Sequence, residues 1–298
     1  MATTKMQART RKAAVAPAPP LPPLVLDLDR TLIRTDLLHE SVFAFLKHNP
    51  FGVFLMLLWA LKGRAYLKQR LARAVTIDVD DMMDWGLLGY YVGEIVQEHK
   101  PVLSGRLHHP NLIKLKHFGA AAASSGGVEM YHIPGVTPEA RTMEEAFGPH
   151  RPQQVLHFGE VERREAWEKL QSATDRRVDF IMLGCPHNAI EQVELVAHLL
   201  RGRKIHPDVA LWVHTPRAIK EIARRAGYLA TIEAAGGVIM SDTCPAISRR
   251  LPEGVRVIAT DSAKQAHYLP AIAKLQGWFG SVRQCVDAAL TGEWQGGL

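Results

Sequence analysis

Cysteine is scarce in this chain, whose 298 residues contain three, at positions 185, 244 and 285. An odd number of widely separated cysteines is a poor framework for disulfide bonds, so the interpretation as a disulfide-stapled secreted domain is excluded. The N-terminal segment has no apolar core before its prolines and therefore does not predict a secretory signal. We expect a protein of a reducing compartment, with the cytoplasm as the default location.

Long apolar runs are also lacking. The longest, residues 51–61, is about half as long as a membrane-spanning helix requires. It predicts a buried helix, and we expect no membrane association. Internal sequence repeats are lacking as well, and low-complexity sequence is confined to the N-terminal tail.

A broad excess of basic charge is absent, although the formal net charge is +6. Much of that excess comes from one basic cluster in the first 23 residues, which contain no acid. The cluster consists of Lys5, Arg9, Arg11 and Lys12. The remainder of the chain is close to charge balance, which is too little to predict a phosphate-binding surface. We therefore expect no nucleic-acid partner.

The chain has the composition of an ordinary globular protein, with 47% hydrophobic and 22% charged residues. Three zones are expected along it. Residues 1–23 form a Pro/Ala-rich tail that is predicted to be disordered. Residues 24–79 open with the apolar strand LVLDLD and continue with apolar helical segments. An acidic cluster at residues 78–84 marks the junction with the third zone, residues 80–298, where strands, polar loops and helices alternate.

Four apolar runs in the third zone each predict a buried strand of a parallel sheet. They are residues 178–184, 209–215, 237–243 and 255–261. The helix after the first strand has apolar residues at helical spacing on one face. They are Ile190, Val193, Val196, Ala197 and Leu200. Strands alternating with helices predict an α/β fold with a doubly wound, mostly parallel sheet, preceded by a short α/β N-terminal appendage.

The helix after the second strand has clear start and stop signals. Thr215 is predicted to cap it, Pro216 suits its first turn, and Gly227 is expected to end it. Its predicted core-facing stripe consists of Ile219, Ile222, Ala223 and Ala226.

Polar residues of the types used in catalysis and metal binding follow three of the predicted strands. The turns after them are residues 184–187, 241–245 and 260–264, and the first two contain Cys185 and Cys244. Ligands of parallel sheets bind where the strands end, and helix N-termini there lower thiol pKa values. The two cysteines are therefore candidate ligands of a soft metal or an iron–sulfur cluster. Zinc with His187 as a third ligand is an alternative, and so is the role of small buried hydrophobes.

Cys285 has a different context. Val282, Val286 and Ala289 share its face of a predicted helix. This pattern predicts a core position.

A second dense feature is the run from Gly119 to Gly127, which contains only glycine, alanine and serine. Small residues let the backbone approach a ligand and offer N–H groups to an anion. A tightly packed helix followed by a turn explains the run equally well. Lys114, Lys116 and His117 precede the run and are candidate partners of a carboxylate or phosphate. For the lysines, a solvated helical face is the alternative.

Five blocks of the sequence resemble successive blocks of the aconitase X family, in the same order. They are DWGLLGYYVGE (84–94), IKLKHFGAAAASSGGVEMYHIPGVTPEA (113–140), MLGCPHNAIEQ (182–192), SDTCPAI (241–247) and TDSAKQAHY (260–268). The resemblance covers roughly residues 80–298. It implies an aconitase-like architecture, a cysteine-bound iron–sulfur cluster and dehydration of a small anionic hydroxy acid, such as mevalonate 5-phosphate or 3-hydroxyproline.

The resemblance also implies roles for individual residues. Cys185 and Cys244 would be the metal and cluster ligands. The residues implied in catalysis are Ser124, Ser125, His187, Ser241, Ser262 and Lys264. Those implied in substrate binding are Lys116, His117, Gly126 and Gly127. In this chemistry an open iron acts as a Lewis acid on the departing hydroxyl group, and a base removes the proton next to a carboxylate.

The sequence departs from the family pattern at its N-terminal side. The family carries a further cluster cysteine there, in a threonine–cysteine–alanine–proline context, and no cysteine precedes Cys185 in this sequence. We therefore expect the chain to supply two of three cluster ligands and to need a small subunit or another complementing polypeptide. A non-catalytic chimeric fragment is the alternative.

The segment LVLDLDRTLIRTD (24–36) resembles the nucleophile motif of haloacid dehalogenase-type phosphatases, and the likeness extends to about residue 75. It implies an alternative activity, a Mg²⁺-dependent phosphohydrolase with Asp27 as nucleophile and Asp29 as acid/base. Arg30 stands where glycine is usual in that family, and the later motifs of a complete phosphatase domain do not appear. A truncated strand-plus-helices appendage is the favoured interpretation of this segment.

Overall fold

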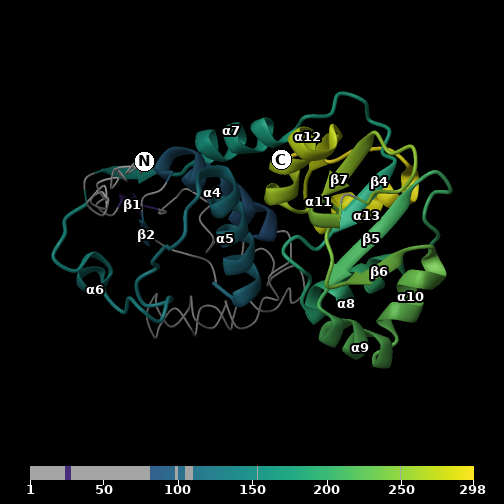
Figure 1. The fold of residues 1–298 in the computed structure, drawn as a ribbon, viewed down its shortest axis with the longest axis horizontal. Coiled ribbons are helices and arrows are strands. Elements are labelled where there is room, and N and C mark those ends of the chain that lie inside the picture. Colours follow the sequence, from purple (N-terminus) through teal and green to yellow (C-terminus); the bar gives the residue numbers. More distant parts are fainter. Residues whose placement is uncertain (1–23, 28–80, 98–99, 105–109, 153, 249) are drawn as a thin grey trace, which may run out of the picture.

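A computed structural model gives the arrangement of the chain. It describes residues 24–27, 81–97, 100–104, 110–152, 154–248 and 250–298. The predicted tail (1–23), Asp29 and nearly all of the phosphatase-like segment lie outside the described residues. The described chain forms two lobes, each built around a parallel sheet (Figure 1).

The first lobe contains a three-stranded sheet. Strand β1 (Leu24–Asp27) lies between β2 (Pro101–Ser104) and β3 (Val155–His157), and both pairings are parallel. The helices of this lobe are α4 (Asp81–Val96), α5 (Leu112–Gly126), α6 (Met143–Phe147) and α7 (Glu160–Leu170). The predicted strand at the start of the segment 24–79 is thus present as β1.

The second lobe contains five parallel strands in the order β6-β5-β4-β7-β8. They are β4 (Phe180–Leu183), β5 (Ala210–Thr215), β6 (Val238–Ser241), β7 (Val257–Thr260) and β8 (Gln276–Phe279). All four predicted strands of this zone are confirmed within narrower bounds, and β8 was not predicted. The chain adds strands outward from β4 on one side and then reverses, so the switch point of the sheet lies between β4 and β7.

Helices cover both faces of this sheet. They are α8 (Ile190–Leu200), α9 (Arg217–Arg225), α10 (Tyr228–Ala235), α11 (Pro245–Ser248), α12 (Ala263–Ala273) and α13 (Val282–Thr291). Alternate side chains of β4 point to opposite faces. Ile181 and Leu183 join the core under α8, α10 and α13, whereas Phe180 and Met182 join a second core that includes Leu269 of α12. The doubly wound α/β architecture is confirmed.

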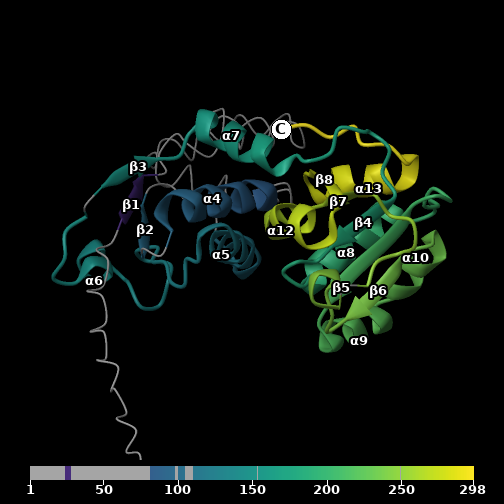
Figure 2. The same ribbon diagram turned by 45° about the horizontal axis from the view of Figure 1, so that its top comes forward.

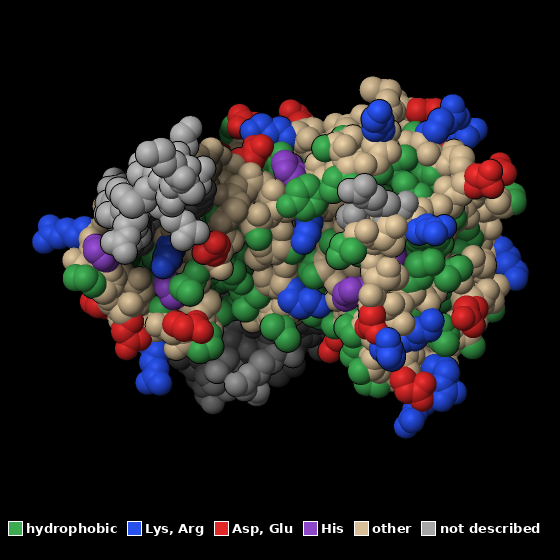
Figure 3. Space-filling model, viewed as in Figure 1, with side chains coloured by type: hydrophobic (Ala, Val, Ile, Leu, Met, Phe, Trp, Pro, Cys, Tyr) green, Lys and Arg blue, Asp and Glu red, His purple; other side chains and the backbone are tan. Residues whose placement is uncertain are grey.

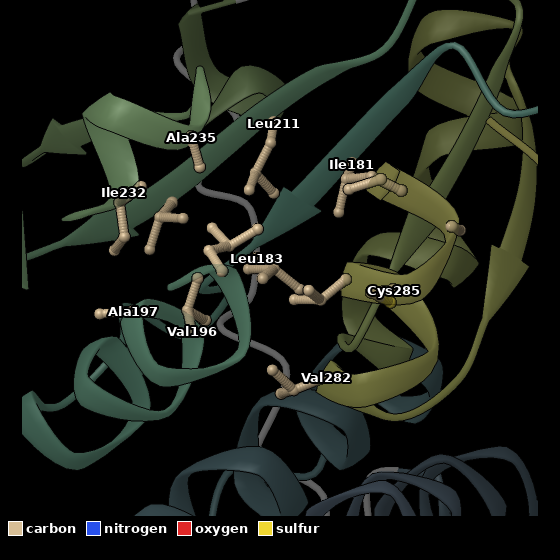
Figure 4. Packing of buried hydrophobic residues seen from close by; sticks show 14 of the residues in the cluster. Ile181, Leu183, Val196, Ala197, Leu211, Ile232, Ala235, Val282 and Cys285 are labelled. Carbon is tan, nitrogen blue, oxygen red and sulfur yellow. The ribbon is translucent and has the colours of Figure 1, made fainter. Parts of the chain in front are cut away.

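Cys285 lies in the first of these cores, as predicted. Figure 4 shows it on α13 with Val282, near Ile181 of β4. It is fully buried, and burial raises the pKa of its thiol. This cysteine is a packing residue.

The prediction for the start of α9 was wrong. Thr215 is the last residue of β5, and its hydroxyl donates a hydrogen bond of 2.8 Å to the carbonyl of Asn188. The first N–H of the helix, on Arg217, instead donates to Asp242 Oδ1 at 3.0 Å. The predicted apolar stripe is also narrower than expected, because Ala223 is buried but Ile222 is 49% exposed. Hydrogen bonds to residues in the loops after β4 and β6 therefore override the local capping signal.

The run from Gly119 to Gly127 is a packed helix, the second of the two interpretations raised by the sequence. Helix α5 lies against α4 so closely that a Cβ atom on Gly126 would overlap the carbonyl of Gly93. Ser125 donates a hydrogen bond of 2.9 Å to the carbonyl of Tyr90 across the same contact. Gly127 ends α5 in the left-handed region, with φ of 70°. Small residues are required here because two backbones meet.

The two lobes meet along α12. Figures 1 and 2 both place α12 at the boundary, beside α4 and α5, and contacts between these helices confirm it. On the face seen in Figure 3, acidic and basic side chains are interspersed over the second lobe. Among the described helices, none combines the length and apolar character needed to cross a membrane.

A pair of glycine substitutions tests the α4–α5 contact. Gly126→Ala should destabilise the protein by about 1–3 kcal/mol or more, because the methyl group forces the two backbones apart. Gly119→Ala is the matched control on the same helix, since its nearest neighbour would be Tyr131 Cε1 at an ordinary 3.5 Å. It should stabilise the helix by up to about 1 kcal/mol. Urea unfolding measures both, and equal effects of the two changes would contradict the close contact.

Candidate active site

The two candidate ligand cysteines lie at the same rim of the second sheet. Cys185 follows β4 directly after Gly184, and Cys244 follows β6 by three residues. Gly184 has φ of 98°, and a Cβ atom there would overlap the carbonyl of His214 on β5. Only glycine fits this turn, because the end of β4 passes so close to the neighbouring strand.

The side chain of Gln265 joins the two thiols. Its Nε2 atom lies 3.1 Å from Cys185 Sγ and 3.4 Å from Cys244 Sγ. The two thiols are also hydrogen-bond partners, which together with burial raises the pKa of Cys185, while Gln265 and Lys264 act in the opposite direction. The expectation that the two turns meet is therefore confirmed, and Lys264 is close enough to act on the pair. Neither cysteine forms a disulfide.

The start of α12 positions Gln265. Ser262 is the N-cap, and its hydroxyl accepts a hydrogen bond of 3.1 Å from the backbone N–H of Gln265. Ser262 in turn donates its own N–H to Thr260 Oγ1 at 3.2 Å. The positive end of the α12 dipole lies beside the thiols, where it opposes the rise in the pKa of Cys185. Ser262, predicted as catalytic, has a capping role in the structure.

Two histidines flank the thiol pair. His187 places Nε2 3.0 Å from the carbonyl of Thr243, the residue before Cys244. His214, the penultimate residue of β5, is almost fully buried. Burial and the nearby His187 lower the pKa of His214 to about 4, so its imidazole is neutral at neutral pH. The sequence analysis missed His214, although its position near the end of a predicted strand was a usable signal.

Helix α5 contributes a cation. Lys116 donates a hydrogen bond of 2.6 Å from Nζ to the carbonyl of His187, so the first lobe reaches the turn after Cys185. Partial burial lowers the pKa of Lys116. His117 is fully buried, lies 3.3 Å from Gln192 Nε2 of α8 and has a pKa lowered by burial to about 4. The structure thus brings Lys116 to the candidate site and places His117 in the packing between α5 and α8.

The other predicted residues lie at several places. Ser124 and Ser125 are near the C-terminal end of α5, and their hydroxyl groups donate to the backbone of α5 and α4. Gly126 and Gly127 close the same helix. Ser241 is the last residue of β6, three positions before Cys244. Proposed roles for these residues in catalysis and substrate binding stay predictions.

Asp261 is a second residue that the sequence analysis missed. It follows β7 and is fully buried close to Gly184 and Cys285. Burial raises its pKa from 3.8 to about 7, and the backbone N–H of Gly184 offsets only part of that effect. Neither carboxyl oxygen has a partner with full hydrogen-bond geometry among the described residues. A carboxyl group is therefore held next to the cysteine turn in an environment that favours its neutral form.

The donor set fits a soft metal in part. Two adjacent thiols beside a helix N-terminus are suitable ligands for iron. Within the described ranges, however, no group of three or more His, Cys, Asp or Glu side chains is arranged to hold a metal ion. His187 Nε2 points at a carbonyl, so the zinc site with His187 as third ligand gains no support.

The buried carboxyl group generates a pH prediction. Because the folded-state pKa of Asp261 lies above its ordinary value, the folded protein keeps a proton that the unfolded chain loses, and stability declines as pH rises towards 7. Asp261→Asn removes the titrating carboxyl group and with it this pH dependence of stability. From about pH 5 to about pH 8, the free energy of unfolding of the variant should rise by roughly 2–3 kcal/mol relative to that of the parent protein. Urea unfolding at both pH values measures the difference, and a pH-independent difference would show that Asp261 is not shifted.

Comparisons with known proteins agree with this geometry. Two domain models of the aconitase X family match the chain, the second domain over residues 72–168 and the third domain over residues 178–291. The first segment covers α4 to α6, β2, β3 and most of α7 in the first lobe, without β1, and the second covers the strands and helices of the second lobe. Cis-3-hydroxy-L-proline dehydratase of Pseudomonas aeruginosa is 38% identical over 264 residues, which are 84% of this chain and 45% of that protein.

Two further relatives extend the comparison. The phosphomevalonate dehydratase large subunit of Methanocaldococcus jannaschii is 38% identical over 201 residues, 67% of this chain and 48% of that protein. The crystal structure of aconitase X from Thermococcus kodakaraensis, in its holo form, superposes with a TM-score of 0.59 at 28% identity, covering 72% of this chain and 53% of that one. The chain spans about half the length of the curated relatives it matches. With both domain models together matching more than half of its residues, the chain belongs to the aconitase X family.

Proposed function

We propose that this chain is part of a hydro-lyase that dehydrates a small anionic hydroxy acid, with Cys185 and Cys244 as two ligands of an iron–sulfur cluster. The observation that carries the proposal is the meeting of the two thiols on the amide of Gln265, at the rim beside the switch point of the sheet. Relatives named as dehydratases support the reaction type. When bound, the cluster supplies Lewis acidity towards the departing hydroxyl group.

The cations near the thiols suit an anionic substrate. Lys116 is half-buried and is fixed on the carbonyl of His187, and Lys264 acts electrostatically on Cys185. A partly desolvated ammonium group binds a carboxylate or phosphate more strongly than an exposed one does. We assign substrate binding to these two lysines. The names of the relatives favour a hydroxyproline or a phosphorylated hydroxy acid as the substrate class.

A base is available in His187. The carbonyl of Thr243 only accepts hydrogen bonds, so His187 Nε2, 3.0 Å away, carries the ring proton. The lone pair of the neutral ring is then on Nδ1, which makes this atom the proton acceptor. We propose His187 Nδ1 as the base that removes the proton next to the substrate carboxylate, a role typically worth about 10²–10⁴-fold in rate. Buried His214, neutral at neutral pH, adds no competing charge.

A partner polypeptide completes the site in this proposal. In the part of the chain that the structure describes, no third His, Cys, Asp or Glu side chain joins the two thiols in an arrangement that could hold a metal ion, and the relatives named as large subunits imply a small subunit. We propose that the missing cluster ligand comes from such a polypeptide or from chain outside the described residues.

The three cysteines are free thiols, which is in keeping with a cytoplasmic location.

Cysteine substitutions test the cluster assignment. Cys185→Ser and Cys244→Ser should each reduce bound iron and acid-labile sulfide to background after anaerobic reconstitution of the full chain with its complementing polypeptide, because the cluster loses one of the two thiolate ligands that this chain supplies. Cys285→Ala is the matched control, since this cysteine is a core residue on α13, and it should keep its iron. Iron retained at the parent level in either serine variant would refute the assignment.

A further inference from the structure

Gln265 is a fully buried side chain whose amide is directed at sulfur. Its Nε2 contacts the thiols of Cys185 and Cys244, at 3.1 Å and 3.4 Å. Its Oε1 has no hydrogen-bond partner among the described residues. A carboxamide nitrogen has two N–H donors and no acceptor, so one donor is available for each sulfur. Both N–H donors of the amide are therefore available to the two sulfurs, while its oxygen has no hydrogen-bond partner among the described residues.

The amides of two other glutamines form hydrogen bonds that support the fold. Gln192 accepts a hydrogen bond of 3.0 Å from the N–H of Ala189 at the start of α8 and contacts His117. Gln171 accepts from the N–H of Phe279 at 2.9 Å and donates to its carbonyl at 3.1 Å. Gln265 makes no comparable backbone contact with its side chain in the described part of the chain. A side chain that only filled space here would not need an amide, because an unpartnered buried acceptor is unfavourable.

The amide is also held in a fixed position. Gln265 lies in the first turn of α12, where the Ser262 cap binds its backbone N–H. Ser262 is itself tied to the end of β7 through Thr260. The donors therefore approach the sulfurs from α12, the helix that follows β7, whereas Cys185 follows β4 and Cys244 follows β6. Three separate strand ends, those of β4, β6 and β7, converge on this one hydrogen-bonding unit.

We propose that Gln265 is the positioning residue of the metal-binding thiol pair: its two N–H donors fix the directions of both sulfurs and stabilise negative charge on them. This inference rests on the proposed function, because it assumes that the two sulfurs bind metal. Hydrogen bonds from a neighbouring residue orient metal ligands and tune their electron donation, and loss of such a bond typically weakens metal binding by about 10–100-fold.

The test uses Co²⁺ alone as the probe, added anaerobically to the full chain, because bonds between Co²⁺ and thiolates give charge-transfer absorption. Gln265→Met keeps the bulk of the side chain and removes both donors. We expect its dissociation constant for Co²⁺ to rise by about 10–100-fold. We also expect the charge-transfer band to move to longer wavelength, because a sulfur that loses an N–H donor holds its lone-pair electrons less tightly.

A matched control separates positioning from packing. Gln192→Met removes an equally buried amide whose contacts are Ala189 and His117. It should lower stability without moving the band or the dissociation constant. Gln265→Leu, which is similar in size and lacks both donors, should reproduce the band shift, and it carries the test should the methionine variant fail to fold.

The outcomes distinguish the two proposals. A parent chain that gives the thiolate band while Gln265→Met and Gln265→Leu keep its wavelength and affinity overturns the role of Gln265 and leaves the cysteine assignment standing. A parent chain that gives no thiolate band overturns both. A shifted band in the Gln265 variants, together with an unmoved band in Gln192→Met, supports the positioning role.

Discussion

Parallel pairing of β4 with β5 on one side and β7 on the other is the constraint on which the rest of the structure depends. Because all strands of this sheet run the same way, their carboxyl ends share one rim. The reversal of strand order next to β4 places α8 and α12 on opposite faces of the sheet. Cys185 lies at this point, and Gly184 lets the turn pass the backbone of β5 without a clash.

The rim concentrates polar groups that a core would normally exclude. His214, Asp261 and Gln265 are all almost fully buried, and each has at least one polar atom without a hydrogen-bond partner among the described residues. Such groups reduce stability unless a ligand, a water molecule or a reacting group uses them. Their gathering around two thiols at one strand-end rim marks the place where this fold trades stability for chemistry.

The first lobe contributes position more than reactive groups. Close packing of α4 on α5 depends on small residues at the contact, and it orients α5 so that Lys116 reaches the turn after Cys185. The run of glycine, alanine and serine therefore acts through helix packing, and its backbone N–H groups are used within the helix. The same run was open to a ligand-binding interpretation, because small residues serve both purposes.

Local sequence determined four strands of the second sheet, the apolar stripe of α8 and the positions of Cys185 and Cys244 at strand ends, since period-two and helical patterns depend only on near neighbours. It also indicated that Cys285 is a core residue.

What the sequence alone did not reveal is which strand ends meet. Gln265 is ordinary in sequence, and only the placement of β7 beside β4 brings its amide to both sulfurs. Likewise Thr215 carries a capping signal, but tertiary contact with Asn188 claims its hydroxyl. Burial decides the ionisation of Asp261 and His214, and burial is a property of the assembled layers, so only the tertiary structure could assign it.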